Sequence, residues 1–262
     1  MALATVVRPA VPAIDGFFGD TAAAAEIVSM LGLLAAHAIM LRLDKRSWAY
    51  VALDRGAARP IVLVRGWLLG ALPILVPSLV LLGAGWLAMR QSPNGPWWIV
   101  AVKLSVLLLV AALFEELFSR GYVFAVLREW LGWPVALALT SLAFGLLHLT
   151  NPGADARSVS IVVLSGFYLG AVLIVLRSLY AAWMTHVAWN WSMAVLLHTA
   201  VSGHIFTHPD YQIVDNGPNW LTGGAWGPEG GAGGATGTLI GLGYLFWRFN
   251  KKKNEQIRQP QG

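Results

Sequence analysis

The residues best able to do chemistry in this chain lie inside long apolar segments. An ionisable side chain within a membrane costs free energy unless a partner, a water-filled cavity or a function accounts for it. Six polar residues of this kind are candidates for one site: Glu115, Glu116, Arg120, His148, His186 and Asn190. Carboxylate and imidazole side chains that share a pocket are suited to general acid–base catalysis.

The adjacent carboxylates Glu115 and Glu116 are predicted to have different roles. Neighbouring side chains on a helix point about 100° apart, so the two are not expected to face one partner. Glu116 and Arg120 are four residues apart, and this spacing favours an ion pair on one helix face. Glu115 then remains as a carboxylate without a cation on its own helix.

His148 is predicted to lie beside Glu115, because the two residues are equally far from a turn. The helix that carries Glu115 is expected to continue to about Leu131 and to turn at residues 132–134. Glu115 and His148 each lie about 16.5 residues from the middle of that turn, which is roughly 25 Å along antiparallel helices. The two side chains are therefore expected at the same height.

A later apolar segment supplies His186 and Asn190, which are four residues apart and share a helix face. Three helices can thus direct these side chains, with Glu115 and His148, into one buried and wet pocket. There a carboxylate and an imidazole polarise a water, and the second histidine with the asparagine stabilises an oxyanion. The spacing of these residues alone favours a catalytic role and a purely structural role equally.

The composition places these residues in a membrane protein. The chain has 262 residues, of which 57% are apolar and 12% charged, with a mean hydropathy of +0.63. A soluble domain carries about 25% charged residues, so an ordinary soluble enzyme is excluded. The chain has no cysteine, which excludes disulfides, thiolate nucleophiles and cysteine-ligated metals.

Seven apolar runs are the candidate membrane spans, since a crossing helix needs about 20 mostly apolar residues. The predicted fold class is therefore all-α, a polytopic helical membrane protein with about seven transmembrane helices. Pro73 and Pro77 are expected to kink the second helix without ending it. The runs cover residues 22–42, 61–89, 97–118, 134–150, 158–177, 179–199 and 233–249.

The basic residues alternate between the predicted loops. Fourteen lysines and arginines fall on one side of the membrane, and three, at positions 8, 90 and 157, fall on the other. The positive-inside rule then puts the N-terminus outside and the C-terminus in the cytoplasm of a multi-pass protein of the cell (inner) membrane. The net charge of +5 is thus a feature of loops in contact with the bilayer, and no nucleic-acid partner is expected.

The remaining ionisable residues in the spans are interpreted as structural. Glu26, His37 and Lys103 also lie in apolar runs, where a satisfied polar group is the ordinary case. A histidine cluster at positions 198, 204 and 208 raises the alternative of a divalent metal site. Gly203 and Pro209 favour a loop over a preformed site there.

Three motifs in order resemble those of one family, the CPBP intramembrane proteases, also called the type II CAAX prenyl protease or Abi family. Residues 115–120, EELFSR, resemble its EExxxR motif. Residues 144–148, FGLLH, resemble its FxxxH motif, and residues 186–190, HVAWN, resemble its HxxxN/D motif. The glycine-rich stretch 221–230 resembles a segment before the last span of many bacterial members. The resemblance covers about residues 97–249.

The resemblance implies an intramembrane endopeptidase in which Glu115 is the general base and His148 assists it. It implies an oxyanion hole of His186 and Asn190, with Glu116 and Arg120 in support. The implied substrates are membrane-associated peptides or proteins, including prenylated CAAX-type tails. A glutamate-activated water needs no metal, so no cofactor is favoured, with zinc as the alternative.

On this basis the chain divides into four parts. An N-terminal segment, 1–21, precedes the N-terminal transmembrane helices, 22–96. The protease-like core spans 97–249, and a basic cytoplasmic tail covers 250–262, of which residues 251–262 are expected to be disordered. Eukaryotic relatives are described with eight spans, so seven or eight helices are expected.

Two other classes of protein fit the same residues. One is a non-catalytic immunity or scaffold protein that uses this fold to bind a partner. The other is an ion-coupled transporter, whose relay also needs buried carboxylates and histidines. The two halves of the chain show no repeat and no matching pair of broken helices, which argues against a transporter.

Overall fold

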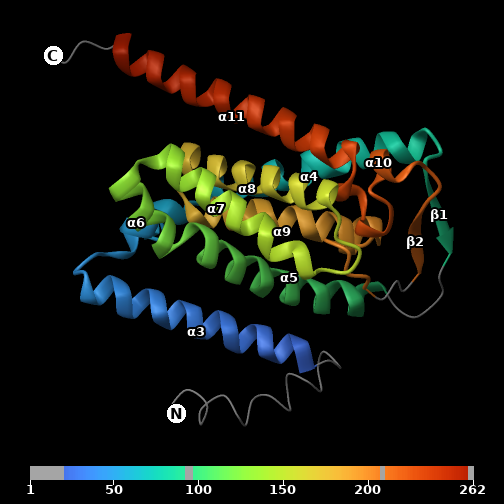
Figure 1. The fold of residues 1–262 in the computed structure, drawn as a ribbon, viewed down its shortest axis with the longest axis horizontal. Coiled ribbons are helices and arrows are strands. Elements are labelled where there is room, and N and C mark those ends of the chain that lie inside the picture. The colour runs from blue at the N-terminus through green and yellow to red at the C-terminus, as the bar shows by residue number, and fades with distance from the viewer. Residues whose placement is uncertain (1–20, 92–96, 207–209, 259–262) are drawn as a thin grey trace.

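The computed structural model describes residues 21–91, 97–206 and 210–258, and its helices form one elongated bundle (Figure 1). The expected N-terminal segment, residues 1–21, lies almost wholly outside the described residues. The bundle contains α3 (Thr21–Leu43), α4 (Pro60–Gly83), α5 (Trp97–Arg120), α6 (Tyr122–Leu131), α7 (Trp133–Leu147), α8 (Ala156–Leu176), α9 (Leu179–Trp191) and α11 (Ala232–Arg258). The predicted all-α membrane class agrees with this bundle.

Shorter elements lie between these helices. A two-stranded antiparallel sheet pairs β1 (Leu87–Gln91) with β2 (Tyr211–Asp215) at one end of the bundle (Figure 1). The helix α10 (Asn219–Thr222) follows β2, and one turn of 3-10 helix, η3 (His148–Thr150), follows α7. Two more short turns, η5 (Gly224–Trp226) and η6 (Pro228–Gly230), form the glycine-rich stretch before α11.

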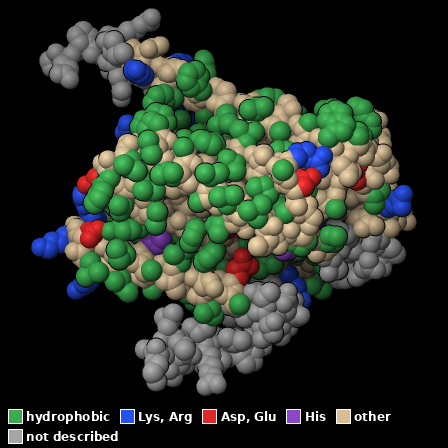
Figure 2. All heavy atoms as spheres, in the orientation of Figure 1, with side chains coloured by type: hydrophobic (Ala, Val, Ile, Leu, Met, Phe, Trp, Pro, Cys, Tyr) green, Lys and Arg blue, Asp and Glu red, His purple; other side chains and the backbone are tan. Residues whose placement is uncertain are grey.

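Five segments among the described residues are long and apolar enough to cross a membrane. They are Ala25–Leu43, Pro60–Gly83, Trp97–Leu131, Trp133–Thr150 and Ala156–Leu176. Hydrophobic side chains cover much of the face in Figure 2 and charged ones are sparse there, as expected for a surface in contact with lipid. The count of seven or eight spans stays a prediction, since α9 has only 13 residues.

Three predicted boundaries are wrong. The second apolar run ends as a helix at Gly83, not at residue 89, because Leu87–Gln91 pairs as β1. The sixth run is α-helical only to Trp191 and continues as the π-helix η4 (Ser192–Leu197). Residues 251–258 of the tail predicted to be disordered are helical, because α11 extends to Arg258, and residues 259–262 lie outside the described part of the chain.

The turns that position α5 and α7 are set by glycine. Gly132, at φ +79°, turns the chain from α6 into α7, as the sequence predicted. The helix before it does not run unbroken from α5, because it breaks at Gly121. His37 lies at this break and its Nε2 accepts a hydrogen bond from the Tyr122 backbone N–H at 3.0 Å. The interpretation of His37 as structural agrees with this contact.

Close helix packing fixes α9 in the centre of the bundle. A Cβ added at Gly66 or Gly70 of α4 would lie 2.6 or 2.0 Å from a backbone oxygen of α9. Small residues permit such close approach between membrane helices. The Thr185 hydroxyl adds a hydrogen bond to the Gly66 carbonyl at 2.9 Å. The helix that carries His186 is thus held close against α4 at Gly66 and Gly70.

Candidate active site

Glu116 is the buried acceptor on which this site is built. Its side chain is fully buried, and its Oε1 accepts hydrogen bonds from Arg120 Nη1 at 2.8 Å and from His186 Nδ1 at 2.9 Å. The ion pair with Arg120 follows from the four-residue spacing. The contact with His186 joins α5 to α9 over 70 residues of sequence.

Arg120 is held from three sides. Besides the bond to Glu116, its Nη2 donates to the Gly166 carbonyl on α8 at 3.1 Å. Its guanidinium lies over the Phe144 ring of α7, 4.4 Å from the ring centroid. A planar guanidinium suits both contacts better than the compact ammonium group of lysine. Arg120 therefore links α5, α7 and α8 around the site.

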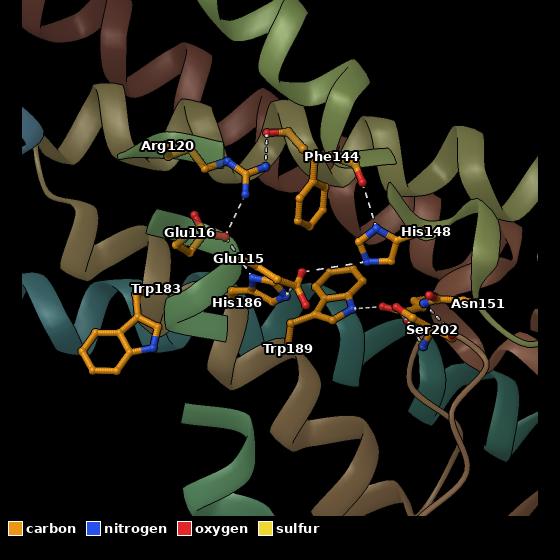
Figure 3. Close-up of polar contacts among 12 residues, drawn as sticks. Glu115, Glu116, Arg120, Phe144, His148, Asn151, Trp183, His186, Trp189 and Ser202 are labelled. Atoms are coloured by element: carbon orange, nitrogen blue, oxygen red, sulfur yellow. Dashed lines mark hydrogen bonds and ion pairs between the residues drawn. The ribbon is translucent and has the colours of Figure 1, made fainter. Parts of the chain in front are cut away.

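Glu115 points toward two imidazole rings (Figure 3). Its Oε2 lies 3.9 Å from His148 Nε2 and 3.8 Å from His186 Nε2, and it has no hydrogen-bond partner. These separations exceed a direct hydrogen bond, and they are the kind of gap that a water bridges. The side chain of Glu115 is 32% exposed, in contrast to that of Glu116.

Hydrogen bonds at the opposite ring nitrogens fix how the two imidazoles face Glu115. His148 Nδ1 lies 2.8 Å from the Phe144 carbonyl, which can only accept, so Nδ1 carries the proton. His186 Nδ1 lies against the Glu116 carboxylate and donates to it in the same way. Both Nε2 atoms are thereby turned toward Glu115.

The site contains a small cavity with room for water. The cavity has a volume of about 30 Å³, and a buried water needs about 10–15 Å³ of such space. His148, His186 and Asn190 line it, which brings Asn190 to the site expected for it. Polar side chains converge on this volume from η3, α8, α9 and the segments before α11.

Sequence reasoning missed the part of Glu229 in this cavity. The Glu229 carboxylate accepts hydrogen bonds from Trp189 Nε1 at 2.7 Å and from the backbone N–H and hydroxyl of Ser202. Glu229 and Ser202 both line the cavity. The available signal was a single acidic residue within the glycine-rich stretch 221–230.

One expectation about the carboxylates is wrong. Glu115 and Glu116 were not expected to face one partner, yet His186 contacts Glu116 through Nδ1 and lies 3.8 Å from Glu115 through Nε2. The imidazole bridges the two because its two nitrogens are distinct hydrogen-bonding sites that point in different directions. Two side chains that point in different directions from one helix can therefore both lie near a single residue of a second helix.

The described residues show no group of three His, Asp or Glu side chains arranged to hold a metal ion. His198 of the histidine cluster instead stacks on Tyr211, with its Nδ1 2.6 Å from the Tyr211 carbonyl. His208 of that cluster lies outside the described residues.

The comparison with protein families agrees with the motifs. Residues 93–192 match the family model of the type II CAAX prenyl endopeptidase Rce1-like proteins. Over these residues the chain is similar to that family. The matched segment contains all six candidate site residues. No curated protein and no solved structure matches the chain. The match is to a protease family, and the described helices include five that are long and apolar enough to cross a membrane.

Proposed function

We propose that this protein is an intramembrane endopeptidase that cleaves a peptide bond with water activated by Glu115. The observation that carries the proposal is the position of Glu115 Oε2, within 4 Å of both His148 Nε2 and His186 Nε2 and without a hydrogen-bond partner. A water between these atoms can give its proton to Glu115 while the oxygen attacks the scissile carbonyl carbon.

His148 assists the base in this mechanism. Because His148 Nδ1 donates to the Phe144 carbonyl, its Nε2 offers a lone pair that accepts a hydrogen bond from the same water. The water is thereby oriented by two acceptors. Glu115 holds the first proton and passes it to the leaving amine nitrogen as the C–N bond breaks.

His186 and Asn190 stabilise the oxyanion of the tetrahedral intermediate. His186 donates from Nε2 only as an imidazolium, and the Glu116 carboxylate at its Nδ1 favours that form. Asn190 lines the same cavity and offers an amide N–H. Donors of this kind are most effective in a buried site of low dielectric constant.

The proposed substrates are peptide tails in the membrane, including farnesylated CAAX-type tails, in keeping with the family match over residues 93–192. The proposed reaction is metal-independent. The proposed orientation places the arginine-rich end of the bundle and the C-terminus in the cytoplasm, with the protein in the cell membrane.

Purified wild-type protein in detergent is incubated with farnesylated and unmodified CAAX-type peptides, and the products are read by mass spectrometry. The matched variants are Glu115→Gln at the site and Glu129→Gln on the surface of α6, where Glu129 pairs with Arg46. Wild type and Glu129→Gln are expected to cleave, and Glu115→Gln to lose about 10²–10⁴-fold in rate.

The same assay separates the alternatives. Cleavage by Glu115→Gln at the wild-type rate contradicts the general-base role. Activity that a chelator removes and zinc restores contradicts the metal-free reaction. If wild type cleaves no peptide while captured membrane partners bind equally to Glu115→Gln, a non-catalytic binding protein is indicated.

A further inference from the structure

A second cavity lies between α4 and α11, away from the candidate active site. It has a volume of about 490 Å³ and shares no lining residue with the cavity at His148 and His186. Most of its wall is apolar, with Leu72, Val76 and Ile240 among the lining side chains. These three are also exposed on the outer surface of the bundle. We refer to this cavity as the α4–α11 groove.

The packing of the two helices shows which way the groove runs. A Cβ added at Gly237 of α11 would lie 1.7 Å from the Pro73 carbonyl oxygen of α4, and one at Gly233 would lie 3.0 Å from the Leu81 side chain. Residue numbers thus rise on one helix as they fall on the other, so the helices are antiparallel. Arg65 of α4 and Arg248 of α11 therefore line the same end of the groove.

The two arginines make this end cationic. Among residues 21–91, 97–206 and 210–258, no acidic side chain forms an ion pair with Arg65 or Arg248. Tyr244, one helical turn before Arg248, adds a phenol to the same lining. An apolar slot that ends at two unpaired guanidinium groups is complementary to an anion on a hydrocarbon chain.

The length of the groove matches one leaflet of a bilayer. Arg65 and Pro77 both line it and are twelve residues apart on α4, which is about 18 Å of helix. The hydrocarbon core of a whole bilayer is about 30 Å thick. The groove therefore reaches from an interface to about the middle of the membrane.

We propose that the α4–α11 groove binds one anionic glycerophospholipid. Its phosphate lies between Arg65 and Arg248, and one acyl chain follows Leu72 and Val76 toward Pro77. The lipid belongs to the leaflet at the arginine-rich end of the bundle, where anionic headgroups attract basic residues. A guanidinium group binds a phosphate with two parallel hydrogen bonds, which favours arginine at both positions.

Tyr168 distinguishes this lipid site from a pocket for a substrate chain. Its hydroxyl donates to the Leu69 carbonyl at 2.6 Å, and a Cβ added at Gly241 would lie 2.6 Å from its ring. Leu69 and Gly241 line the groove, whereas Tyr168 lines the cavity at His148 and His186. A chain in the groove is thus separated from the reacting atoms by a buried tyrosine.

Native mass spectrometry of the purified protein tests the proposal with dioleoylphosphatidylglycerol and dioleoylphosphatidylcholine as probes. The variant Arg65→Gln/Arg248→Gln is compared with Arg42→Gln/Arg55→Gln, which removes two exposed arginines outside the groove. Wild type and the control are expected to prefer phosphatidylglycerol. The groove variant is expected to bind it roughly 10-fold or more weakly. Unchanged binding by the groove variant, or equal binding of both lipids by wild type, overturns the proposal.

A second variant tests the acyl-chain site and guards against misfolding of the first. Leu72→Trp fills the groove from an exposed position, and it is expected to reduce the phosphatidylglycerol-bound fraction while both arginines remain. Displacement of the lipid by a farnesylated peptide would instead identify the groove as a substrate site and overturn the proposal. The readout is lipid binding, so it is independent of peptide cleavage and can be repeated on Glu115→Gln.

Discussion

The Oε1 atom of Glu116 lies 2.9 Å from His186 Nδ1, so a fully buried carboxylate orients the imidazole that faces Glu115. The same oxygen accepts from Arg120, which balances its charge in the interior. A carboxylate behind a histidine fixes the tautomer and the ring orientation. Glu116 thus has the geometry of a positioning residue, while Glu115 Oε2 faces the Nε2 atoms of His148 and His186.

Glu116→Gln is therefore expected to lower kcat about 10- to 100-fold with little change in KM. A glutamine still accepts a hydrogen bond, but it does not stabilise an imidazolium at His186 and it leaves Arg120 without a counter-charge. Steady-state cleavage of a farnesylated CAAX-type peptide measures the two constants, with Glu129→Gln as the surface control. A lower melting temperature with unchanged kcat would show that Glu116 serves stability only.

The close contact between α4 and α9 predicts a second effect on the site. The Cβ of Gly70→Ala would lie 2.0 Å from the Thr185 carbonyl oxygen, next to His186. Overpacking of this kind lowers the unfolding free energy by about 1–3 kcal/mol. If α9 moves away to relieve the clash, His186 is displaced with it. We expect both stability and cleavage to fall. Thermal unfolding in detergent and peptide cleavage measure the two effects.

Gly83→Ala is the matched control on the same helix. An added Cβ at Gly83 meets nothing within 4 Å, so this variant is expected to retain wild-type stability and activity. Equal behaviour of Gly70→Ala and Gly83→Ala would mean that the two helices can separate without cost to the site.

The helix that forms one wall of the site begins at a titratable cap outside the membrane-spanning segment. The Asp155 side chain accepts a hydrogen bond from the Ser158 backbone N–H at 2.6 Å, and the Ser158 hydroxyl oxygen accepts one from the Asp155 backbone N–H. The bond from the Ser158 backbone holds the pKa of Asp155 below its ordinary value. The charged cap therefore stabilises the N-terminus of α8.

A pH dependence follows from this cap. Because the folded-state pKa is lowered, the stabilisation is present above the unfolded pKa of about 3.9 and is lost as the pH falls through the folded value. Asp155→Ala is expected to cost about 1 kcal/mol at pH 7 and less below pH of about 3. Melting temperatures across this range test it, with Asp155→Asn as a cap that does not titrate. A constant difference between wild type and Asp155→Ala at all pH values would contradict the prediction.

Much of the site could be predicted because the helix period relates the number of residues between two side chains to the directions in which they point. The four-residue interval of Glu116 and Arg120 gave their ion pair, and equal distance from the turn at Gly132 gave the approach of Glu115 to His148. Both depend on one helix or on one hairpin of helices. The approach of α9, which brings His186 between the carboxylates, depends on packing against Gly66 and Gly70.

The parts that could not be predicted arise where the chain leaves regular helix. The apolar run 61–89 reads as continuous helix, yet Leu87–Gln91 pairs with a strand more than 100 residues away. That strand, β2, has only five residues, too few for an alternating pattern to identify it from the sequence. The contacts of Glu229 could not be predicted either, because its partners Trp189 and Ser202 are 40 and 27 residues away in the sequence.

Glu229 is expected to fix the glycine-rich stretch against the catalytic cavity. Glu229→Ala leaves the Trp189 indole N–H and the Ser202 N–H without their acceptor, at about 1–3 kcal/mol for each buried donor. Unfolding free energy should fall by that order, and cleavage should fall with it, because Ser202 and Glu229 line the cavity beside His148. Chemical unfolding in mixed detergent and peptide cleavage provide the two measurements.

Two control variants accompany Glu229→Ala. Glu229→Gln keeps an acceptor oxygen of the same reach, so it is expected to recover part of the unfolding free energy and part of the cleavage rate. Glu255→Ala on the exposed surface of α11 should change neither the stability nor the cleavage rate. Wild-type stability in Glu229→Ala would mean that water replaces the carboxylate, and the stretch would then owe its position to backbone packing alone.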